Sequence, residues 1–455
     1  MASIVADNDM PTTTTEGSEL PHFEDLRGIL QICNGTDTKP GVVSYLENDI
    51  QSVINMFAKT CKTFLNNEAH NPLRYSFYRI VLSKKYSVDF GGARVDLEQK
   101  NITNEDLRKI GELLKTNKTL KKLSLSDNST EWGGNNITDY TDVQCICEGL
   151  KRNNTLKKLD LSKNNITDVQ SIVELIKTNN TLTELDLPYT YYCHNINYAQ
   201  SIGKALKANS TLKILDLSCI IWGWESNNDD DWHGVSIKFV KSIGNALKTN
   251  NILTKLIIRN NNIIDVQSIG EMLKTNNTLK SLDLRNNNIT DIESISEALK
   301  TNNTLKELLL GYNNITDIQS IGDALKTKKS LKVLYLNNNN ITDVQSIGEG
   351  LKTNNTLKWL ILCDNNITDV QSIGEGLKRN NTLKILNISN NDITDDSGIQ
   401  SIIDGLKTNN TLKKLYLHYN QLISRNMRSQ LYVIEQYKRD GSNGYQQVKG
   451  MDIWK

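Results

Sequence analysis

Asn340-Ile-Thr-Asp-Val-Gln-Ser-Ile-Gly-Glu-Gly-Leu-Lys-Thr-Asn-Asn-Thr-Leu-Lys-Trp-Leu-Ile-Leu362 is a stretch that returns, with few changes, along most of this chain. Its most constant landmark is the leucine of the Thr-Leu pair or its equivalent. Between Leu253 and Leu383 this leucine recurs five times at intervals of 26 residues. A period of this length, sustained over so many units, indicates a stack of like structural units rather than one globular core. Further copies of the leucine are Leu120, Leu156, Leu182, Leu212 and Leu412.

The first part of each unit predicts a short strand. In the segment 156–164, Leu159 and Leu161 are apolar and the residues beside them are polar. This alternation is typical of a strand with one buried face. The side chains that flank the buried leucines then point to the opposite face, so their identities can be read directly from the sequence.

The second part of each unit predicts a helix. Thr342 is followed three residues later by Gln345, which is the pattern of a capping box at a helix start. Val344, Ile347 and Leu351 then recur at helical spacing, so we expect them to face inward. The same capping box is predicted at Thr167/Gln170, Thr290/Glu293, Thr316/Gln319 and Thr368/Gln371.

The pattern LxxLxLxxN resembles the leucine-rich repeat signature, and the helix in each unit resembles the ribonuclease-inhibitor class, which NLR receptors and Ran GTPase-activating proteins share. The resemblance implies an α/β solenoid, or horseshoe, with a concave parallel β-sheet of about twelve strands and convex helices. It also implies a buried ladder of asparagines that bond neighbouring loops. The pattern fails at Lys100, Thr190 and Ile220. The matching asparagines are Asn128, Asn164, Asn261, Asn287, Asn313, Asn339, Asn365, Asn391 and Asn420.

Composition predicts five segments. Residues 1–19 are polar and predict a disordered tail, and residues 20–90 predict a helical N-terminal cap or small domain because apolar residues recur there at helical spacing. The repeats occupy 91–422, an amphipathic capping helix is expected at 423–440, and 441–455 is expected to form a flexible tail.

Two interpretations of residues 20–90 stay open. One is a cap that seals the first repeat, because the ends of a repeat stack need shielding. The other rests on Val43-Ser-Tyr-Leu46, Asp49-Ile50 and the segment 58–64, which resemble the F-box pattern. An F-box followed by leucine-rich repeats would imply a substrate receptor of an SCF-type ubiquitin ligase, with the ligase adaptor as partner.

Three insertions interrupt the period, at 126–141, 188–198 and 218–237. All three enter after the strand and before the helix, so we expect them to project from one rim. They contain four of the six tryptophans, namely Trp132, Trp222, Trp224 and Trp232. Tryptophan is enriched at binding hot spots, so these residues are candidates for partner contacts, although they could equally form local cores against the rim.

The outward strand positions change character along the stack. Early repeats offer charged residues such as Lys158, Asp160 and Asp186, and later repeats offer apolar and aromatic ones. An exposed apolar strip has no folding role and is typical of a contact site, unless the C-terminal segment folds back over it. The candidate strip consists of Leu309, Val333, Tyr335, Trp359, Ile361, Ile385 and Tyr416.

Composition excludes several classes of function. With 53 basic and 52 acidic residues the net charge is +1, so no global field favours nucleic acid or a membrane. Lysines do recur in columns, but acidic residues such as Asp291 and Asp343 recur with them, which argues against a nucleic-acid interface. No apolar run is long enough to cross a membrane, and the seven cysteines show no zinc spacing, so we expect a reduced, cytoplasmic chain without a metal.

No catalytic constellation stands out. The five histidines share no ligand spacing, and no phosphate loop or nucleophile elbow is present. We therefore expect no enzyme activity and no cofactor. The sequence predicts a protein-interaction scaffold that binds a partner through the concave face and the rim insertions. The alternatives are the F-box-like ligase receptor and, from the resemblance, a GTPase-activating protein.

Overall fold

The computed structural model describes residues 72–128, 140–164, 166, 169–187, 196–220, 229–327, 330–394, 396–420, 426, 427 and 429. The chain divides into two compact units, Met1–Ile80 and Val81–Lys455. Helix α4 (Pro72–Tyr86) begins with proline, which suits the first position of a helix because its missing N–H has no partner there. The F-box-like residues 43–64 and most of the expected C-terminal capping helix lie outside the described residues, so both remain predictions.

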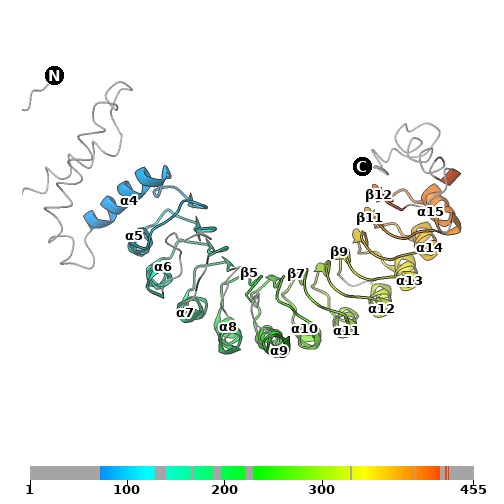
Figure 1. Cartoon of the computed structure of the whole chain (residues 1–455), viewed down its shortest axis with the longest axis horizontal. Helices are drawn as coiled ribbons and strands as arrows, with labels where there is room; N and C mark the ends of the chain where they lie inside the picture. Colours follow the sequence, from blue (N-terminus) through cyan, green and yellow to red (C-terminus); the bar gives the residue numbers. More distant parts are fainter. Residues whose placement is uncertain are drawn as a thin grey trace, which may run out of the picture. The chain divides into compact units, whose positions relative to one another are not determined.

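Within Val81–Lys455, one motif repeats: a three-residue strand, a turn and a helix (Figure 1). The strands lie side by side, and the helices lie on the outer side of the curve that the strands follow. The strands are β1 (Arg94–Asp96), β2 (Lys122–Ser124), β3 (Lys158–Asp160), β4 (Glu184–Asp186), β5 (Ile214–Asp216), β6 (Lys255–Ile257), β7 (Ser281–Asp283), β8 (Glu307–Leu309), β9 (Val333–Tyr335), β10 (Trp359–Ile361), β11 (Ile385–Asn387) and β12 (Lys414–Tyr416). The helices are α5 (Asn104–Thr116), α6 (Tyr140–Arg152), α7 (Val169–Thr178), α8 (Ile196–Ala208), α9 (Asp229–Leu247), α10 (Gln267–Thr275), α11 (Glu293–Leu299), α12 (Gln319–Lys326), α13 (Gln345–Thr353), α14 (Gln371–Arg379) and α15 (Asp396–Thr408).

The strands form one parallel, twelve-stranded sheet in sequence order, which confirms the predicted fold class. Their central residues pair in register, as Leu334, Leu360 and Leu386 do on β9, β10 and β11. These three leucines are 0% exposed. Each buried leucine side chain stabilises the fold by about 1.5–3 kcal/mol. The column of central residues therefore forms a continuous part of the hydrophobic core.

The predicted asparagine ladder is present, and Asn339 illustrates it. Its Nδ2 donates to the main-chain oxygens of Leu310 (3.1 Å) and Leu336 (3.0 Å), and its Oδ1 accepts from the N–H of Ile315 (3.0 Å). The side chain is only 6% exposed, so these bonds satisfy main-chain groups that water cannot reach. At Ile220, where the pattern fails, the residue is buried and its N–H donates to Asn261 instead.

A second asparagine ladder, which the sequence analysis missed, joins the helix ends. Asn354 donates from Nδ2 to the oxygen of Leu325 at the end of α12 (2.8 Å), and its Oδ1 accepts from the N–H groups of Thr356 (3.0 Å) and Leu357 (2.8 Å). The signal was available, because an asparagine recurs three residues before each landmark leucine except Leu331. The members that bond in this way are Asn153, Asn179, Asn209, Asn250, Asn276, Asn302, Asn354, Asn380 and Asn409.

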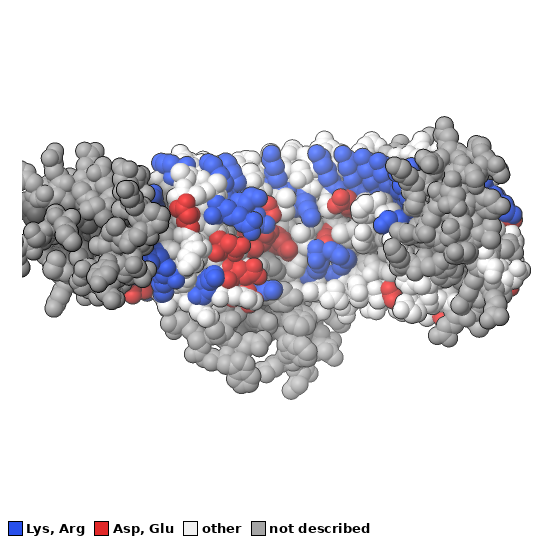
Figure 2. Space-filling model, turned by 90° about the horizontal axis from the view of Figure 1, so that it is seen from above, with Lys and Arg blue, Asp and Glu red and all other residues white. Residues whose placement is uncertain are grey.

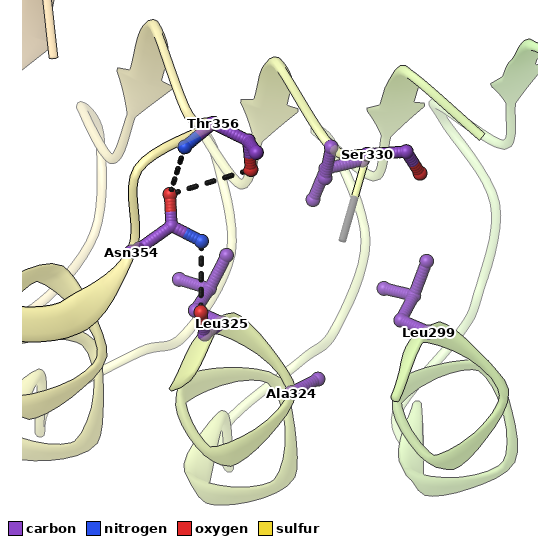
Figure 3. A pocket seen from close by; sticks show the side chains of 7 residues that line it. Leu299, Ala324, Leu325, Ser330, Asn354 and Thr356 are labelled. Atoms are coloured by element: carbon purple, nitrogen blue, oxygen red, sulfur yellow. Dashed lines mark hydrogen bonds between the residues drawn. The ribbon is translucent and has the colours of Figure 1, made fainter. Parts of the chain in front are cut away.

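Lysine replaces asparagine once in this second series. Lys328 stands at the sequence position that Asn302 and Asn354 occupy in the flanking repeats. A small cavity of about 10 Å³ lies between these repeats (Figure 3). It is lined by Leu299, Ala324, Leu325, Ser330, Leu331, Asn354 and Thr356. The cavity holds at most about one water molecule, so it is a packing defect rather than a ligand pocket.

The helices do not start as predicted. Helix α13 is preceded by Val344, which makes no side-chain capping bond, and the acceptor for the N–H of Gln345 is Oδ1 of Asp343 (2.7 Å). The capping box predicted at Thr342 is therefore wrong. Val344 is buried in the core, and α13 begins at Gln345, two residues later than a capping box at Thr342 requires. The same aspartate bond occurs at Asp265, Asp291, Asp317 and Asp369.

The third insertion also differs from expectation. Residues 229–237 are not a rim loop but the first half of α9, a helix of 19 residues. Val235, Phe239, Ile243 and Leu247 are buried at helical spacing, so the apolar pattern of this helix extends into the predicted insertion. Trp232 therefore stands on a helix and not on a loop.

Candidate protein-binding face

The outward side chains of the sheet form two rows, because the strands pair in register and alternate side chains share a face. The first row holds the first residue of each strand: Arg94, Lys122, Lys158, Glu184, Ile214, Lys255, Ser281, Glu307, Val333, Trp359, Ile385 and Lys414. The second row holds the third residue of each strand: Asp96, Ser124, Asp160, Asp186, Asp216, Ile257, Asp283, Leu309, Tyr335, Ile361, Asn387 and Tyr416. We call the side of the sheet that carries these rows the open face.

Charged side chains gather on the open face over part of the sheet (Figure 2). On β3 and β4, Nζ of Lys158 lies 2.5 Å from Glu184 and 2.8 Å from Asp186. Burial raises the pKa of Asp186 to about 6, and the carboxylates of Asp160 and Glu184 add to this rise although Lys158 opposes it. Burial works against the charged form of Lys158, but the bonds to the two carboxylates raise its pKa above the ordinary range. The cluster thus carries more negative than positive charge.

A second ion cluster occupies β6 and β7. Asp283 is 0% exposed, and its carboxylate accepts from Nε of Arg259 (2.7 Å) and from Nη2 of Arg285 (2.8 Å). The bond to Asp283 raises the pKa of Arg285 further above its ordinary value. The charge of the buried Asp283 carboxylate is therefore compensated by two guanidinium groups of the same chain.

The predicted apolar strip is largely continuous. Val333, Trp359 and Ile385 are neighbours in the first row, and Leu309, Tyr335 and Ile361 are neighbours in the second. Trp359 is 42% exposed, and the other five are half-buried. We call these six residues the strip. Tyr416, also predicted, is separated from Ile361 by Asn387 and is therefore not contiguous with it.

Cys363 lies two residues beyond Ile361 of the strip, and His418 lies beside Tyr416. Burial, together with the carboxylate of Asp364, raises the pKa of the Cys363 thiol to about 12, so this thiol is neutral and not a nucleophile. The ring of His418 makes edge contacts with Tyr416 (6.1 Å between centroids) and Tyr419 (5.1 Å). Cys363 therefore adds no reactive group beside the strip.

The rim tryptophans are not brought to this face by any described contact. Trp132, Trp222 and Trp224 lie outside the described residues, and only the main chain of Trp232 is described, in α9. Their predicted role therefore stays a prediction.

A polar groove of about 510 Å³ lies along the turns that follow the last strands. Its lining includes Asn338, Asp364, Asn390 and Tyr419, residues at the turn position where the main chain has a positive φ in many repeats. The groove follows from the repeat itself and shows no arrangement specific to a ligand. Among the described residues, no group of three or more His, Cys, Asp or Glu could hold a metal ion. In the same part of the chain, no helix is both long and apolar enough to cross a membrane.

The fold and its buried asparagines define a solenoid of leucine-rich repeats. A family model described as "Leucine Rich repeats (2 copies)" matches residues 303–352, and one described as "Leucine Rich repeat" matches residues 152–169, 275–292 and 379–400. The chain is a leucine-rich-repeat protein. No curated protein matches the chain.

Two solved structures are similar in part. An internalin from Listeria monocytogenes aligns at 19% identity and a TM-score of 0.43, covering 73% of this chain and 81% of that one. The actin-binding site 2 of leiomodin-1 aligns at 26% identity and a TM-score of 0.25, covering 34% of this chain and 80% of that one. At TM-scores this low, neither likeness says what this chain binds.

Proposed function

We propose that this protein is a non-catalytic scaffold that binds a partner protein through the strip Leu309, Val333, Tyr335, Trp359, Ile361 and Ile385. The observation that carries the proposal is a contiguous set of apolar side chains, led by the 42%-exposed Trp359, on a sheet face that no described helix covers. Folding does not require apolar residues there, because each strand already buries its central leucine on the other side. Contiguous exposed apolar surface of this kind is typical of interaction sites.

The composition of the strip supports a protein partner. Tryptophan and tyrosine are the residues most enriched at binding hot spots, and Trp359 and Tyr335 lie on adjacent strands, diagonal to each other. The main chain beneath them is fixed by the sheet, so little conformational entropy is lost on binding. Tyr416 and the rim tryptophans Trp132, Trp222, Trp224 and Trp232 would extend this contact, and residues 20–90 would act as a cap.

The test compares partner capture by three forms of the full chain. The strip variant is Tyr335→Ser with Trp359→Ser and Ile361→Ser. The control variant is Ile237→Ser with Tyr312→Asn, which removes exposed apolar side chains (42% and 54% exposed) that lie off the strip. Affinity purification from the source cells with quantitative mass spectrometry identifies proteins that the wild type retains.

We expect at least one retained protein to be lost with the strip variant and kept with the control. Circular dichroism of the strip variant should match the wild type, because the substituted side chains point away from the core. Equal retention by all three forms would contradict the proposal.

A further inference from the structure

We propose that the partner segment seated on the strip is acidic as well as apolar, and that a row of six lysines beside the strip holds its carboxylates. This inference rests on the proposed function. Each lysine directly precedes a strand, and the row is unbroken from β7 to β12. Earlier in the chain, Thr183 and Thr254 stand at the same position and interrupt the row. The six residues, which we call the lysine row, are Lys280, Lys306, Lys332, Lys358, Lys384 and Lys413.

Main-chain hydrogen bonds fix the spacing of the lysine row. The N–H of Lys332 donates to the oxygen of Lys306, and that of Lys358 donates to the oxygen of Lys332, each at 2.8 Å. The same bond joins the other neighbours in the row. Neighbouring strands in a sheet lie about 4.8 Å apart, so the row sets six positive charges along roughly 24 Å of one edge. Lys and Arg side chains line one long edge of the open face in Figure 2.

In the part of the chain that the structure describes, the lysine row forms no ion pairs, unlike a second column of lysines at the helix ends. Lys326, Lys352 and Lys378 pair with the acidic residue three positions earlier on their own helix, at 2.6–2.7 Å. Among the described ion pairs, none involves a member of the lysine row. Five of its members are exposed, and Lys384 is half-buried. Like charges at this spacing repel one another, and a bound polyanion would relieve the repulsion.

The aspartates that recur with the lysines in the sequence do not neutralise the row. Asp343 bonds to the N–H of Gln345 at the start of α13, whereas Lys358 follows the end of that helix. The nine residues of α13 lie between them, and they span about 13 Å. These acids therefore do not offset the lysine row, contrary to what their recurrence in the sequence predicts.

The lysine row and the strip are adjacent in the chain. Lys332 precedes Val333, Lys358 precedes Trp359 and Lys384 precedes Ile385. A segment that buries apolar side chains on the strip would therefore place neighbouring side chains within reach of the row. Carboxylates are the groups that complement it, since charge complementarity across an interface favours encounter and register.

A polypeptide fits better than a nucleic acid. Four of the six strip residues are aliphatic, whereas proteins that bind single-stranded nucleic acid stack bases on successive aromatic rings. We therefore assign the lysine row to an acidic, apolar protein segment.

The first test selects peptide ligands from a library, so the natural partner need not be known. A display library of random peptides of about 12 residues, long enough to span the row when extended, is panned against the full chain. The expected outcome is enrichment of peptides that combine Asp or Glu with apolar residues. Enrichment of neutral or basic peptides, or no enrichment, would overturn the proposal.

Two charge-matched variants then locate the contact. The row variant is Lys306→Gln with Lys332→Gln and Lys358→Gln, and the control is Lys300→Gln with Lys326→Gln and Lys352→Gln on the helix ends. Fluorescence anisotropy of a selected peptide should show about tenfold weaker binding to the row variant, equivalent to about 1.4 kcal/mol, and less than about threefold to the control. Equal losses in both variants would overturn the proposal.

The strip variant separates this inference from the proposed function. If strip substitutions abolish capture of the natural partner and row substitutions do not, the proposed function holds and the inference fails. If neither set changes capture, both fail. A single-stranded oligouridine serves as the nucleic-acid probe. If it binds more tightly than the peptides, and if the row variant weakens its binding, the ligand of the lysine row is a nucleic acid and the inference is overturned.

Discussion

The open face over β3–β7 and the open face over β8–β11 are built on the same scaffold and differ only in their outward rows. Both halves bury a central leucine in every strand. Over β3–β7, the outward side chains form ion clusters within the chain, as Lys158 does with Asp186 and as Asp283 does with Arg285. Over β8–β11, six of the eight outward side chains are apolar, the other two being Glu307 and Asn387, and none of the eight belongs to a described ion pair. Charged outward side chains of these clusters over β3–β7 are paired within the chain, whereas the apolar ones over β8–β11 leave a surface that another molecule can contact.

The largest effect should come from the scaffold that the two halves share. Leu215 on β5 and Leu360 on β10 are both 0% exposed. Replacing either by alanine leaves a cavity, and we expect the free energy of unfolding to fall by about 2–5 kcal/mol in each case. Urea unfolding followed by circular dichroism gives the two values. A loss at Leu215 that differs greatly from the loss at Leu360 would show that the halves do not share one scaffold.

A pH-dependent effect should appear only in the charged half. The pKa of Asp186 in the folded protein is about 6, above the ordinary value of 3.8, so the folded state binds a proton more readily than the unfolded state. The contribution of this group to the free energy of unfolding should therefore fall by about 2 kcal/mol as pH rises from 4.5 to 7, through the folded-state pKa of about 6.

The Asp186→Asn variant checks this pH dependence, because it cannot titrate. The wild type should lose stability relative to the variant as pH rises from 4.5 to 7, as measured by urea unfolding at each pH. A difference between the two proteins that stays constant with pH would contradict the assignment. A substitution of Asn387 by Ala, in the apolar half, serves as a control without a titrating group.

The fold could be predicted from the sequence because the same pattern of leucines, asparagines and helical apolar residues recurs in each unit. The leucine period predicted a stack of like units, and the resemblance predicted a parallel sheet of about twelve strands and the ladder to which Asn339 belongs. Strand alternation also allowed the strip to be read, including Trp359 and Tyr335. These features depend on residues within one unit and on the rule that units stack.

The features that the sequence did not predict depend on packing and contacts in three dimensions, which the repeat pattern does not specify. The helix-start bond belongs to Asp343 rather than Thr342 because burial of Val344 shifts the helix start. The two lysine columns looked alike, and only the ion pair between Lys352 and Glu349 distinguishes the helix-end column from the lysine row. Trp132 and its neighbours in the insertions follow no repeat, so no stacking rule places them.

A smaller effect should come from the interrupted second ladder in the apolar half. In the sequence, Lys328 stands where neighbouring repeats carry a buried asparagine, and a cavity of about 10 Å³ is lined in part by Leu299 and Asn354 of these repeats. Replacing Lys328 by Asn should restore hydrogen bonds like those of Asn354 and raise the free energy of unfolding by about 1 kcal/mol. The control is Lys329→Asn, since the equivalent residues Asn303 and Asn355 are exposed. Equal effects of the two substitutions in urea unfolding would show that the ladder position is not special.

The smallest effect on stability should come from the residue on which binding most depends. Trp359 is 42% exposed and lies on the opposite side of β10 from the core. Its replacement by alanine should change the free energy of unfolding by less than about 0.5 kcal/mol, as surface substitutions usually do, while weakening partner binding strongly. Calorimetry of unfolding and partner capture give the two readouts. A side chain that contacts only a partner contributes little to the free energy of unfolding of the unbound chain. A destabilisation of several kcal/mol would therefore mean that Trp359 stabilises the fold itself.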